Sequence, residues 1–182
     1  AYLRSIPNIT VLVPRDHLML ERMLLHAVRV QGPVAIRYPR DKIVANPLKP
    51  GNVKSGKAEV LRQGERLVVF SVGPLCYDVL EAVKETDGVA VVDLVCAKPL
   101  DKETVYRMVE SCQGRFVVVE DGCTQGGVGS AVVESLRDLP HPLRFDFLGM
   151  PDAFIEHGSL CDLKKFLGLD PEGIRKAITR LL

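Results

Sequence analysis

Long runs of apolar residues without polar alternation constrain this chain more than any other feature of its sequence. Residues 9–13 form the run ITVLV, which is mostly β-branched and is closed by Pro14. A run of this kind indicates a strand that is buried on both faces, as in a parallel sheet covered by helices on each side. Further strands are expected at residues 34–38, 67–72, 89–95, 116–119 and 143–148.

Helical patterns separate these strands. Asp16 can cap a helix whose apolar stripe would be Leu20, Met23, Leu24 and Ala27, and the segment Gln31-Gly32-Pro33 ends it. Residues 9–38 therefore predict one strand–helix–strand unit with parallel strands and a right-handed connection. Residues 41–55 contain two prolines, a glycine and two asparagines with little periodicity, which indicates a linker or a domain boundary.

The second part of the chain begins with two short strands, at residues 56–61 and 67–72, around the turn RQGER. Their short connection predicts an antiparallel pair. Helices are expected at residues 75–86, with Cys76, Val79, Leu80 and Val83 inward, after Asp101, at residues 126–139, and after Asp170. Two hydrophobic staples are expected at these helix starts, Leu100 with Val105 and Leu169 with Ile174. The predicted fold is a three-layer α/β/α domain with a mostly parallel sheet.

Composition excludes several classes of function. The 182 residues are 47% hydrophobic and 26% charged, with a net charge of +1, as in a soluble globular protein of one large domain or one domain plus part of another. This charge gives no field that would attract nucleic acid or an anionic membrane, and no apolar run approaches the roughly 20 residues of a membrane span. Five cysteines without a C-x-x-C spacing favour a reducing, cytoplasmic setting. The first residues, AYLRSIPN, lack an initiator Met and resemble the inside of a domain, so the chain is expected to be a fragment.

The segment PVAIRYPRDK places Arg37 and Arg40 at the carboxyl end of a predicted buried strand. In open α/β sheets this end of the strands faces the ligand crevice, where a guanidinium can bind phosphate or carboxylate. Pro39 would stiffen the turn and fix the direction of Arg40. Structural ion pairs at a domain boundary are the alternative interpretation of both arginines.

The segment VVVEDGCTQGGVGSAV is a strand, a glycine-rich turn and a helix. Its helix start could bind an anion, but the spacing of Gly126, Gly127 and Gly129 matches no dinucleotide or P-loop motif. Close packing of the helix on the strand is the favoured explanation. Glu120 and Asp121 are adjacent, so they are expected to point apart rather than to form an acid–base pair.

The segment PDAFIEHGS contains Glu156 and His157, which could form a proton-handling pair. The favoured interpretation is structural, with Phe154 and Ile155 filling the core and His157 satisfying a buried carbonyl. His17, His26 and His141 show no metal-binding spacing, and no Ser or Cys has the setting of an activated nucleophile. The sequence thus assigns no catalytic residue, metal ligand or cofactor-binding residue to this chain.

Six segments resemble a known family in order and content. They are AYLRSIPNITVLVPRD, GPVAIRYPRD, SGKAEVLRQGERLVVFSVG, VVDLVCAKPLD, VVVEDGCTQGGVGSAVVESL and LGMPDAFIEHGSLCDLKKFLGLDPEGI. Together they resemble the C-terminal part of the 1-deoxy-D-xylulose-5-phosphate synthases, which are transketolase-like thiamine diphosphate enzymes. The FIEHG and GLDPEGI motifs are the most specific and separate this family from the beta subunits of 2-oxoacid dehydrogenases, which share the fold.

The resemblance implies a division of the chain and a site. Residues 1–46 would be the end of a truncated pyrimidine-binding α/β domain, residues 47–55 a linker, and residues 56–182 the transketolase C-terminal domain. Members of the family decarboxylate pyruvate and join it to glyceraldehyde 3-phosphate, which supplies isoprenoid, thiamine and pyridoxal synthesis. By this resemblance Arg40 would hold the substrate phosphate, with Arg37 and Tyr38 as further candidates that shape the strand end.

The family resemblance also implies what this chain would need from elsewhere. Thiamine diphosphate and magnesium would bind the full-length enzyme, which would be a homodimer, and neither would bind this fragment alone. The fragment by itself is therefore expected to be inactive. Asp41 replaces a usual glycine, and Val95-Cys96-Ala97 replaces an arginine and aromatic stretch, so the match to the synthases is imperfect. The alternatives are the C-terminal subunit of a split transketolase-like enzyme and a non-catalytic dimerisation or regulatory module.

Overall fold

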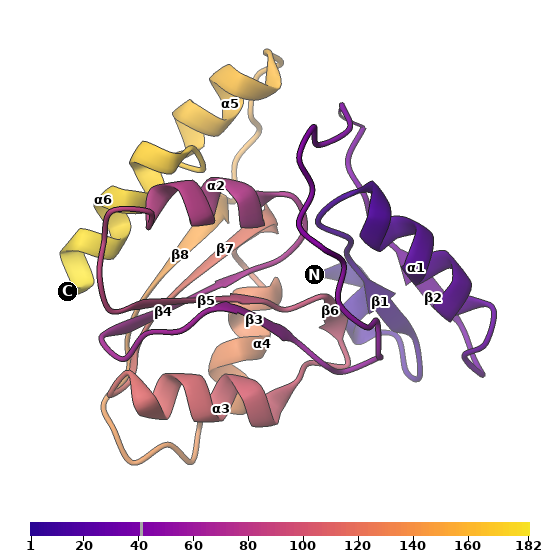
Figure 1. The fold of residues 1–182 in the computed structure, drawn as a ribbon, viewed down its shortest axis with the longest axis horizontal. Coiled ribbons are helices and arrows are strands. Elements are labelled where there is room, and N and C mark those ends of the chain that lie inside the picture. Colours follow the sequence, from indigo (N-terminus) through magenta and orange to yellow (C-terminus); the bar gives the residue numbers. More distant parts are fainter. Residues whose placement is uncertain (41) are drawn as a thin grey trace.

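The computed structural model describes residues 1–40 and 42–182, which form two β-sheets with their helices (Figure 1). The elements of the first sheet and its surroundings are η1 (Tyr2–Ser5), β1 (Thr10–Leu12), α1 (His17–Ala27), β2 (Val34–Ile36) and β6 (Cys96–Lys98). The elements of the second sheet and its covering helices are β3 (Glu59–Arg62), β4 (Leu67–Ser71), α2 (Leu75–Ala82), β5 (Val89–Asp93), α3 (Lys102–Ser111), β7 (Arg115–Cys123), α4 (Val128–Ser135), β8 (Arg144–Met150), α5 (Leu160–Leu167) and α6 (Pro171–Leu181).

The smaller sheet has the strand order β2-β1-β6. Strands β1 and β2 are parallel, with Thr10 opposite Val34, as expected for the first strand–helix–strand unit. Strand β6 joins antiparallel to β1 and was not predicted. The expected strand at residues 89–95 ends at Asp93 because Val95 has a φ of 57°, a left-handed conformation that a β-branched residue rarely adopts and that turns the chain into β6.

Helix α1 begins as predicted, because the Asp16 carboxylate accepts a hydrogen bond from the Met19 backbone N–H. The predicted apolar stripe is only partly right. Met19 and Met23 form the buried face, whereas Leu24 is 54% exposed. The three-stranded sheet is too narrow to cover the full width of the helix, so part of its apolar surface faces outward.

The larger sheet has the order β3-β5-β4-β7-β8, and helices cover both of its faces (Figure 1). Three of its four strand pairs are parallel, which confirms the three-layer, mostly parallel prediction. One core lies between the sheet and helices α3 and α4, and the other lies between the sheet and helices α2 and α6. Strands β4 and β5 are completely buried because both layers cover them.

The predicted antiparallel hairpin of residues 56–61 and 67–72 is wrong. Strand β3 pairs antiparallel with β5, which lies between β3 and β4. The short turn therefore crosses the start of β5 instead of joining two neighbours. Gly64 makes this crossing possible, because a Cβ at this position would lie 2.4 Å from the Ala90 backbone nitrogen. The Arg66 N–H closes the turn by donating to the Gly88 carbonyl oxygen at 2.9 Å.

Several helix boundaries agree with the prediction. Asp101 and Asp170 cap α3 and α6 by accepting from Thr104 and Gly173 N–H groups. The expected staple residues lie within shared cores, Leu100 with Val105 and Leu169 with Ile174. Helix α2 ends at Ala82, four residues before the predicted end, with its predicted inward residues Cys76, Val79 and Val83 buried and Leu80 half-buried. Helix α5 was not predicted.

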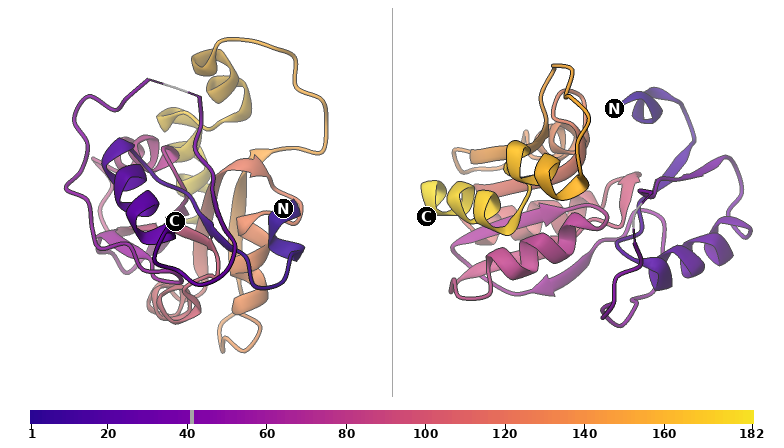
Figure 2. Two further views of the ribbon diagram at one scale, coloured as in Figure 1. Left: turned by 90° about the vertical axis from the view of Figure 1, so that its right-hand side faces the viewer. Right: turned by 90° about the horizontal axis from the view of Figure 1, so that it is seen from above.

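The two sheets lie side by side, with the N-terminal unit at one end of the larger sheet (Figure 2). Among the described residues between β2 and β3 there is no helix or strand, which is the irregular connection that the composition indicates. The division of the chain at residues 46 and 55 stays a prediction.

Candidate functional site

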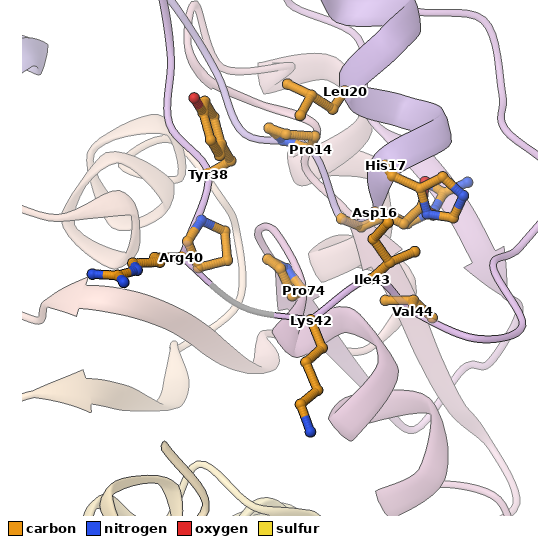
Figure 3. A pocket seen from close by; sticks show the side chains of 12 residues that line it. Pro14, Asp16, His17, Leu20, Tyr38, Arg40, Lys42, Ile43, Val44 and Pro74 are labelled. Atoms are coloured by element: carbon orange, nitrogen blue, oxygen red, sulfur yellow. The ribbon is translucent and has the colours of Figure 1, made fainter. Parts of the chain in front are cut away.

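A cavity of about 340 Å³ lies at the carboxyl ends of β1 and β2 (Figure 3). Its lining comes from the turn after β1, the start of α1, the segment after β2 and the start of the α2 region. The residues are Pro14, Arg15, Asp16, His17, Leu20, Tyr38, Pro39, Arg40, Lys42, Ile43, Val44 and Pro74. This is the end of the sheet at which the sequence predicts a ligand crevice.

Arg40 lies at the rim of this cavity, four residues after the end of β2. Its guanidinium points away from Ile43 and Val44, which lie on the other side of the cavity (Figure 3). No carboxylate among the described residues forms an ion pair with Arg40, and the side chain is exposed. The geometry therefore leaves a cation available at the strand end. Asp41, which replaces the glycine usual in the synthases, lies outside the described residues.

Arg37 has a partner in the other sheet. Its Nη2 atom donates to the backbone oxygen of Asp121 at 2.7 Å and to the Asp121 carboxylate at 2.8 Å. Asp121 belongs to β7, so this contact joins the end of β2 to the larger sheet. Tyr38 follows with its side chain 61% exposed. The structure thus places the arginines in different settings, because Arg37 forms the structural ion pair that was the alternative interpretation and Arg40 forms none with the described residues.

A buried ionic cluster lies beside the cavity and was missed by sequence reasoning. Arg15 is completely buried, and its Nη1 atom lies 2.6 Å from the Glu59 carboxylate and 2.9 Å from the Asp93 carboxylate. Burial lowers the pKa of Arg15, but the hydrogen bonds to Glu59 and Asp93 outweigh it and raise the pKa above its usual value. The one sequence signal that could have indicated a buried Arg15 is the apolar run at residues 9–13, which precedes it.

At Asp93 the effect of burial on the pKa outweighs the effect of the hydrogen bonds. Burial raises the pKa of Asp93 to about 6, although the hydrogen bond from Arg15 and the backbone N–H of Val95 act in the other direction. Nearby, the Tyr77 hydroxyl donates to the Asp16 carboxylate at 2.6 Å, and burial together with this bond raises the pKa of Tyr77 to about 12. These groups hold the cavity wall in place.

The glycine-rich turn before α4 is occupied by the protein itself. The buried Glu120 carboxylate accepts from the Val128 and Gly129 N–H groups, each at 2.9 Å. A Cβ on Gly127 would lie 2.4 Å from a Glu120 carboxylate oxygen, and a Cβ on Gly129 would lie 2.9 Å from the Phe147 ring. The helix start is thus capped and closely packed, as the favoured interpretation has it. Glu120 and Asp121 also have separate partners and do not converge.

The predicted core role of the PDAFIEHGS segment is wrong. Phe154 is fully exposed, at 107% of its reference area, and Ile155 is only partly buried. Glu156 and His157 are exposed as well, and they line a second cavity of about 410 Å³ with Pro74, Leu75 and Leu163 among the other lining residues. The segment follows β8, where the chain leaves the sheet before α5, so its apolar residues do not reach the core.

The described residues do not fit a diphosphate–magnesium site. Among them, no group of three or more His, Cys, Asp or Glu residues could hold a metal ion. The one glycine-rich helix start that was a candidate for phosphate is taken by Glu120. His26 contacts Ser55 instead of another histidine, at 2.9 Å. No helix in the described part of the chain is long and apolar enough to cross a membrane.

Comparison with known proteins adds to this geometry. Residues 56–174 match the family described as the transketolase C-terminal domain. The chain belongs to this family. It is also similar over its whole length to 1-deoxy-D-xylulose-5-phosphate synthases, with 40% identity over 183 residues to one from Thermus thermophilus and 38% over 190 residues to one from Gloeobacter violaceus. The resemblance expected from the six sequence segments is therefore confirmed.

The chain spans 29% of the Thermus relative and 30% of the Gloeobacter relative. Two solved structures share the transketolase fold. A structure described as a split-gene transketolase in an inactive beta4 tetramer has a TM-score of 0.88 and 28% identity, covering 98% of this chain and 59% of its own. A transketolase from Campylobacter jejuni has a TM-score of 0.72 and 20% identity, covering 98% of this chain and 27% of its own.

Proposed function

We propose that this chain is the C-terminal part of a 1-deoxy-D-xylulose-5-phosphate synthase, a thiamine diphosphate-dependent transferase. In this role Arg40 binds the phosphate of glyceraldehyde 3-phosphate, the substrate that joins the two carbons derived from pyruvate. The whole enzyme is a cytoplasmic homodimer that also binds magnesium. The observation that carries the proposal is a guanidinium without a carboxylate partner among the described residues, at the carboxyl end of a parallel strand, in a chain similar throughout its length to such synthases.

The charge of Arg40 and the stiffness of the backbone before it both favour phosphate binding. A charge-assisted hydrogen bond to phosphate requires a guanidinium that is not already neutralised, and Arg40 meets this condition among the described residues. Pro39 restricts the backbone immediately before it, which lowers the cost of holding the side chain in one direction. Arg37 and Tyr38 then serve mainly to shape the strand end.

Phosphate binding by the isolated chain tests this role of Arg40. Isothermal titration with glyceraldehyde 3-phosphate and with inorganic phosphate is expected to show binding in the wild type and its loss in Arg40→Ala. Arg137→Ala is the matched control, because Arg137 is also exposed, at 82%, and pairs only with the neighbouring Asp138 among the described residues. Equal binding in the wild type and Arg40→Ala would refute the assignment.

Turnover tests whether this chain needs further parts of such an enzyme for activity. The isolated chain is expected to release no carbon dioxide from pyruvate, and this expectation agrees with the lack of a cluster of three or more His, Cys, Asp or Glu residues among the described residues. We expect activity only when the chain is joined to the upstream part of such an enzyme. Release of carbon dioxide by the 182 residues alone would contradict this expectation.

A split enzyme is the second candidate function. Its support is the likeness to the split-gene transketolase structure, which covers nearly all of this chain. In that case the chain would bind a separate diphosphate-binding partner chain, and the two would be active only together. Co-purification with such a partner would favour this candidate. A chain that binds neither phosphate nor a catalytic partner would instead act as a dimerisation or regulatory module.

A further inference from the structure

The strand end that carries Arg40 is held at Arg37, through the backbone by its own sheet and through the side chain by the larger sheet. The backbone ladder of the smaller sheet ends when the Arg37 N–H donates to the Leu12 oxygen at 2.9 Å. Among the described residues, no hydrogen bond involves Tyr38, Pro39 or Arg40. Arg37 is therefore the last residue held in place before Arg40.

The Arg37 side chain extends this anchor across the boundary between the sheets. One nitrogen, Nη2, contacts both the carbonyl oxygen and the carboxylate of Asp121. Arg37 and Asp121 are 84 residues apart in the chain, so the contact depends on the packing of the two sheets. The Arg37 and Asp121 side chains are 41% and 27% exposed, which makes the pair accessible to substitution without opening a core.

Asp121 is itself held firmly. The preceding residue, Glu120, is 4% exposed and binds the first N–H groups of α4 with both carboxylate oxygens. Strand β7, to which both residues belong, pairs with β4 and β8 up to Val119, and its pairing with β8 resumes at Cys123 after a register shift. Asp121 thus lies in a short segment held by Glu120 on one side and by Cys123 on the other, so bonds to its backbone oxygen and carboxylate restrain the Arg37 side chain.

We propose that Arg37 is a positioning residue, which holds the Arg40 guanidinium in its phosphate-binding position by anchoring the end of β2 to Asp121. This inference rests on the proposed role of Arg40 in binding phosphate. Three residues of extended chain span up to about 10 Å, so an unanchored strand end would let Arg40 sample a wide region. Restricting that region lowers the entropy lost when phosphate binds.

Two other roles for Arg37 make different predictions. If Arg37 bound phosphate directly, Asp121 would compete with the ligand, and its removal would strengthen binding. If Arg37 only neutralised Asp121, replacing both residues would restore the binding that the loss of Arg37 alone reduces. If Arg37 positions the strand end, either single substitution weakens binding, and the double substitution is no worse than Arg37→Gln alone.

The test combines a backbone measurement with a binding measurement on the 182-residue chain. Nitrogen-15 relaxation of the Tyr38 and Arg40 amides, in phosphate-free buffer, reports the order of the strand end in the wild type, Arg37→Gln, Asp121→Ala and the double variant. Titration with inorganic phosphate reports the dissociation constant of each protein. Arg180→Gln is the matched control, because it breaks an exposed arginine–aspartate pair, with Asp146, on the far strand β8.

We expect the order parameters at residues 38 and 40 to fall most in Arg37→Gln, which loses both bonds to Asp121, and to fall less in Asp121→Ala, which keeps the bond to the backbone oxygen. They should stay unchanged in Arg180→Gln. The dissociation constant for phosphate should rise about tenfold in Arg37→Gln, with no further rise in the double variant. Unchanged order parameters in Arg37→Gln and Asp121→Ala would overturn the positioning role, whatever happens to binding. Restored binding in the double variant would overturn it as well.

Phosphate titration of Arg40→Ala, added to these measurements, separates this inference from the proposed function. If the order parameters fall as expected but Arg40→Ala binds phosphate as the wild type does, the phosphate role of Arg40 is wrong and the anchoring by Arg37 is right. If Arg40→Ala loses binding and Asp121→Ala gains it, the phosphate site is right and Arg37 is a direct ligand instead of a positioning residue.

Discussion

The Arg15 guanidinium and the Asp93 carboxylate lie 2.9 Å apart with no exposed side-chain surface, although one residue follows a strand of the smaller sheet and the other ends a strand of the larger sheet. Arg15 comes just after β1, and Asp93 is the last residue of β5. The carboxylate of Glu59, in β3, is the third member of the cluster and lies 2.6 Å from Arg15 Nη1. This cluster and the Arg37–Asp121 pair are two separate ionic connections between the elements of the two sheets.

Removing the buried cation should destabilise the protein strongly. Arg15→Gln would leave the Asp93 carboxylate in the interior without its charged partner, and we expect a loss of about 3 kcal/mol in the free energy of unfolding. Urea denaturation followed by circular dichroism measures this loss. Arg180→Gln, which removes an exposed ion pair, should change the free energy by no more than about 0.5 kcal/mol. Equal losses of unfolding free energy in the two variants would show that the buried cluster stabilises the protein no more than an exposed ion pair does.

The raised pKa of Asp93 predicts a dependence of stability on pH. Because burial lifts the pKa to about 6 in the folded protein, the folded state binds this proton more tightly than the unfolded chain does. The stabilisation is fully present below the unfolded pKa of about 4 and is lost as pH rises through about 6. The total loss across this window is about 3 kcal/mol.

Asp93→Asn provides the comparison for this pH dependence. The variant lacks the titrating group, so its stability should not show the decline between about pH 4 and about pH 6 that Asp93 causes in the wild type. Carbon-13 NMR of the Asp93 carboxyl gives its pKa directly. A midpoint near about 4, or parallel stability curves for the two proteins, would contradict the expected behaviour.

Gly64 should be irreplaceable at the crossing between β3 and β4. An added Cβ would lie 2.4 Å from the Ala90 nitrogen and 2.6 Å from the Gly88 oxygen, which are backbone atoms that cannot move aside. We expect Gly64→Ala to lower the free energy of unfolding by about 2 kcal/mol or more. Gly158→Ala is the control, because its nearest neighbour would be 3.5 Å away. Thermal denaturation of both variants checks the difference.

Phe154 should tolerate substitution despite its size. Its side chain is fully exposed, so Phe154→Ser is expected to change the free energy of unfolding by less than about 0.5 kcal/mol. Ile174 has 0% exposure within the core beside α6, and Ile174→Ala should cost about 3 kcal/mol. Chemical denaturation of both variants measures the two changes. A large loss in Phe154→Ser would mean that the segment packs against the domain after all.

The local sequence was sufficient for features that depend on neighbours in the chain. The caps at Asp16, Asp101 and Asp170 follow from a short side chain that reaches N–H groups three residues later. The parallel pairing of β1 and β2 follows from an intervening helix, and the buried runs predict the covered, mostly parallel sheet. The separate roles of Glu120 and Asp121 follow from the alternation of side chains along a strand.

Features that depend on distant pairing could not be predicted in this way. The antiparallel hairpin was a reasonable local inference, but β5 enters between β3 and β4 because a central strand gains cover from both sheet faces and two neighbours. The core role of Phe154 failed for a similar reason, since apolar character does not show whether the chain has already left the sheet. Strand β6 depends on a single strained residue, Val95.

By itself, the sequence determined the fold class, the family resemblance and the position of Arg40 at a strand end, because these depend on composition, periodicity and motifs along the chain. Only the tertiary structure decided which arginine has a partner. Arg15 and Arg37 find carboxylates contributed by the larger sheet, whereas Arg40 finds none among the described residues. Ion pairing acts across a few ångströms of space, and residues as far apart as 37 and 121 become neighbours only when the two sheets pack together.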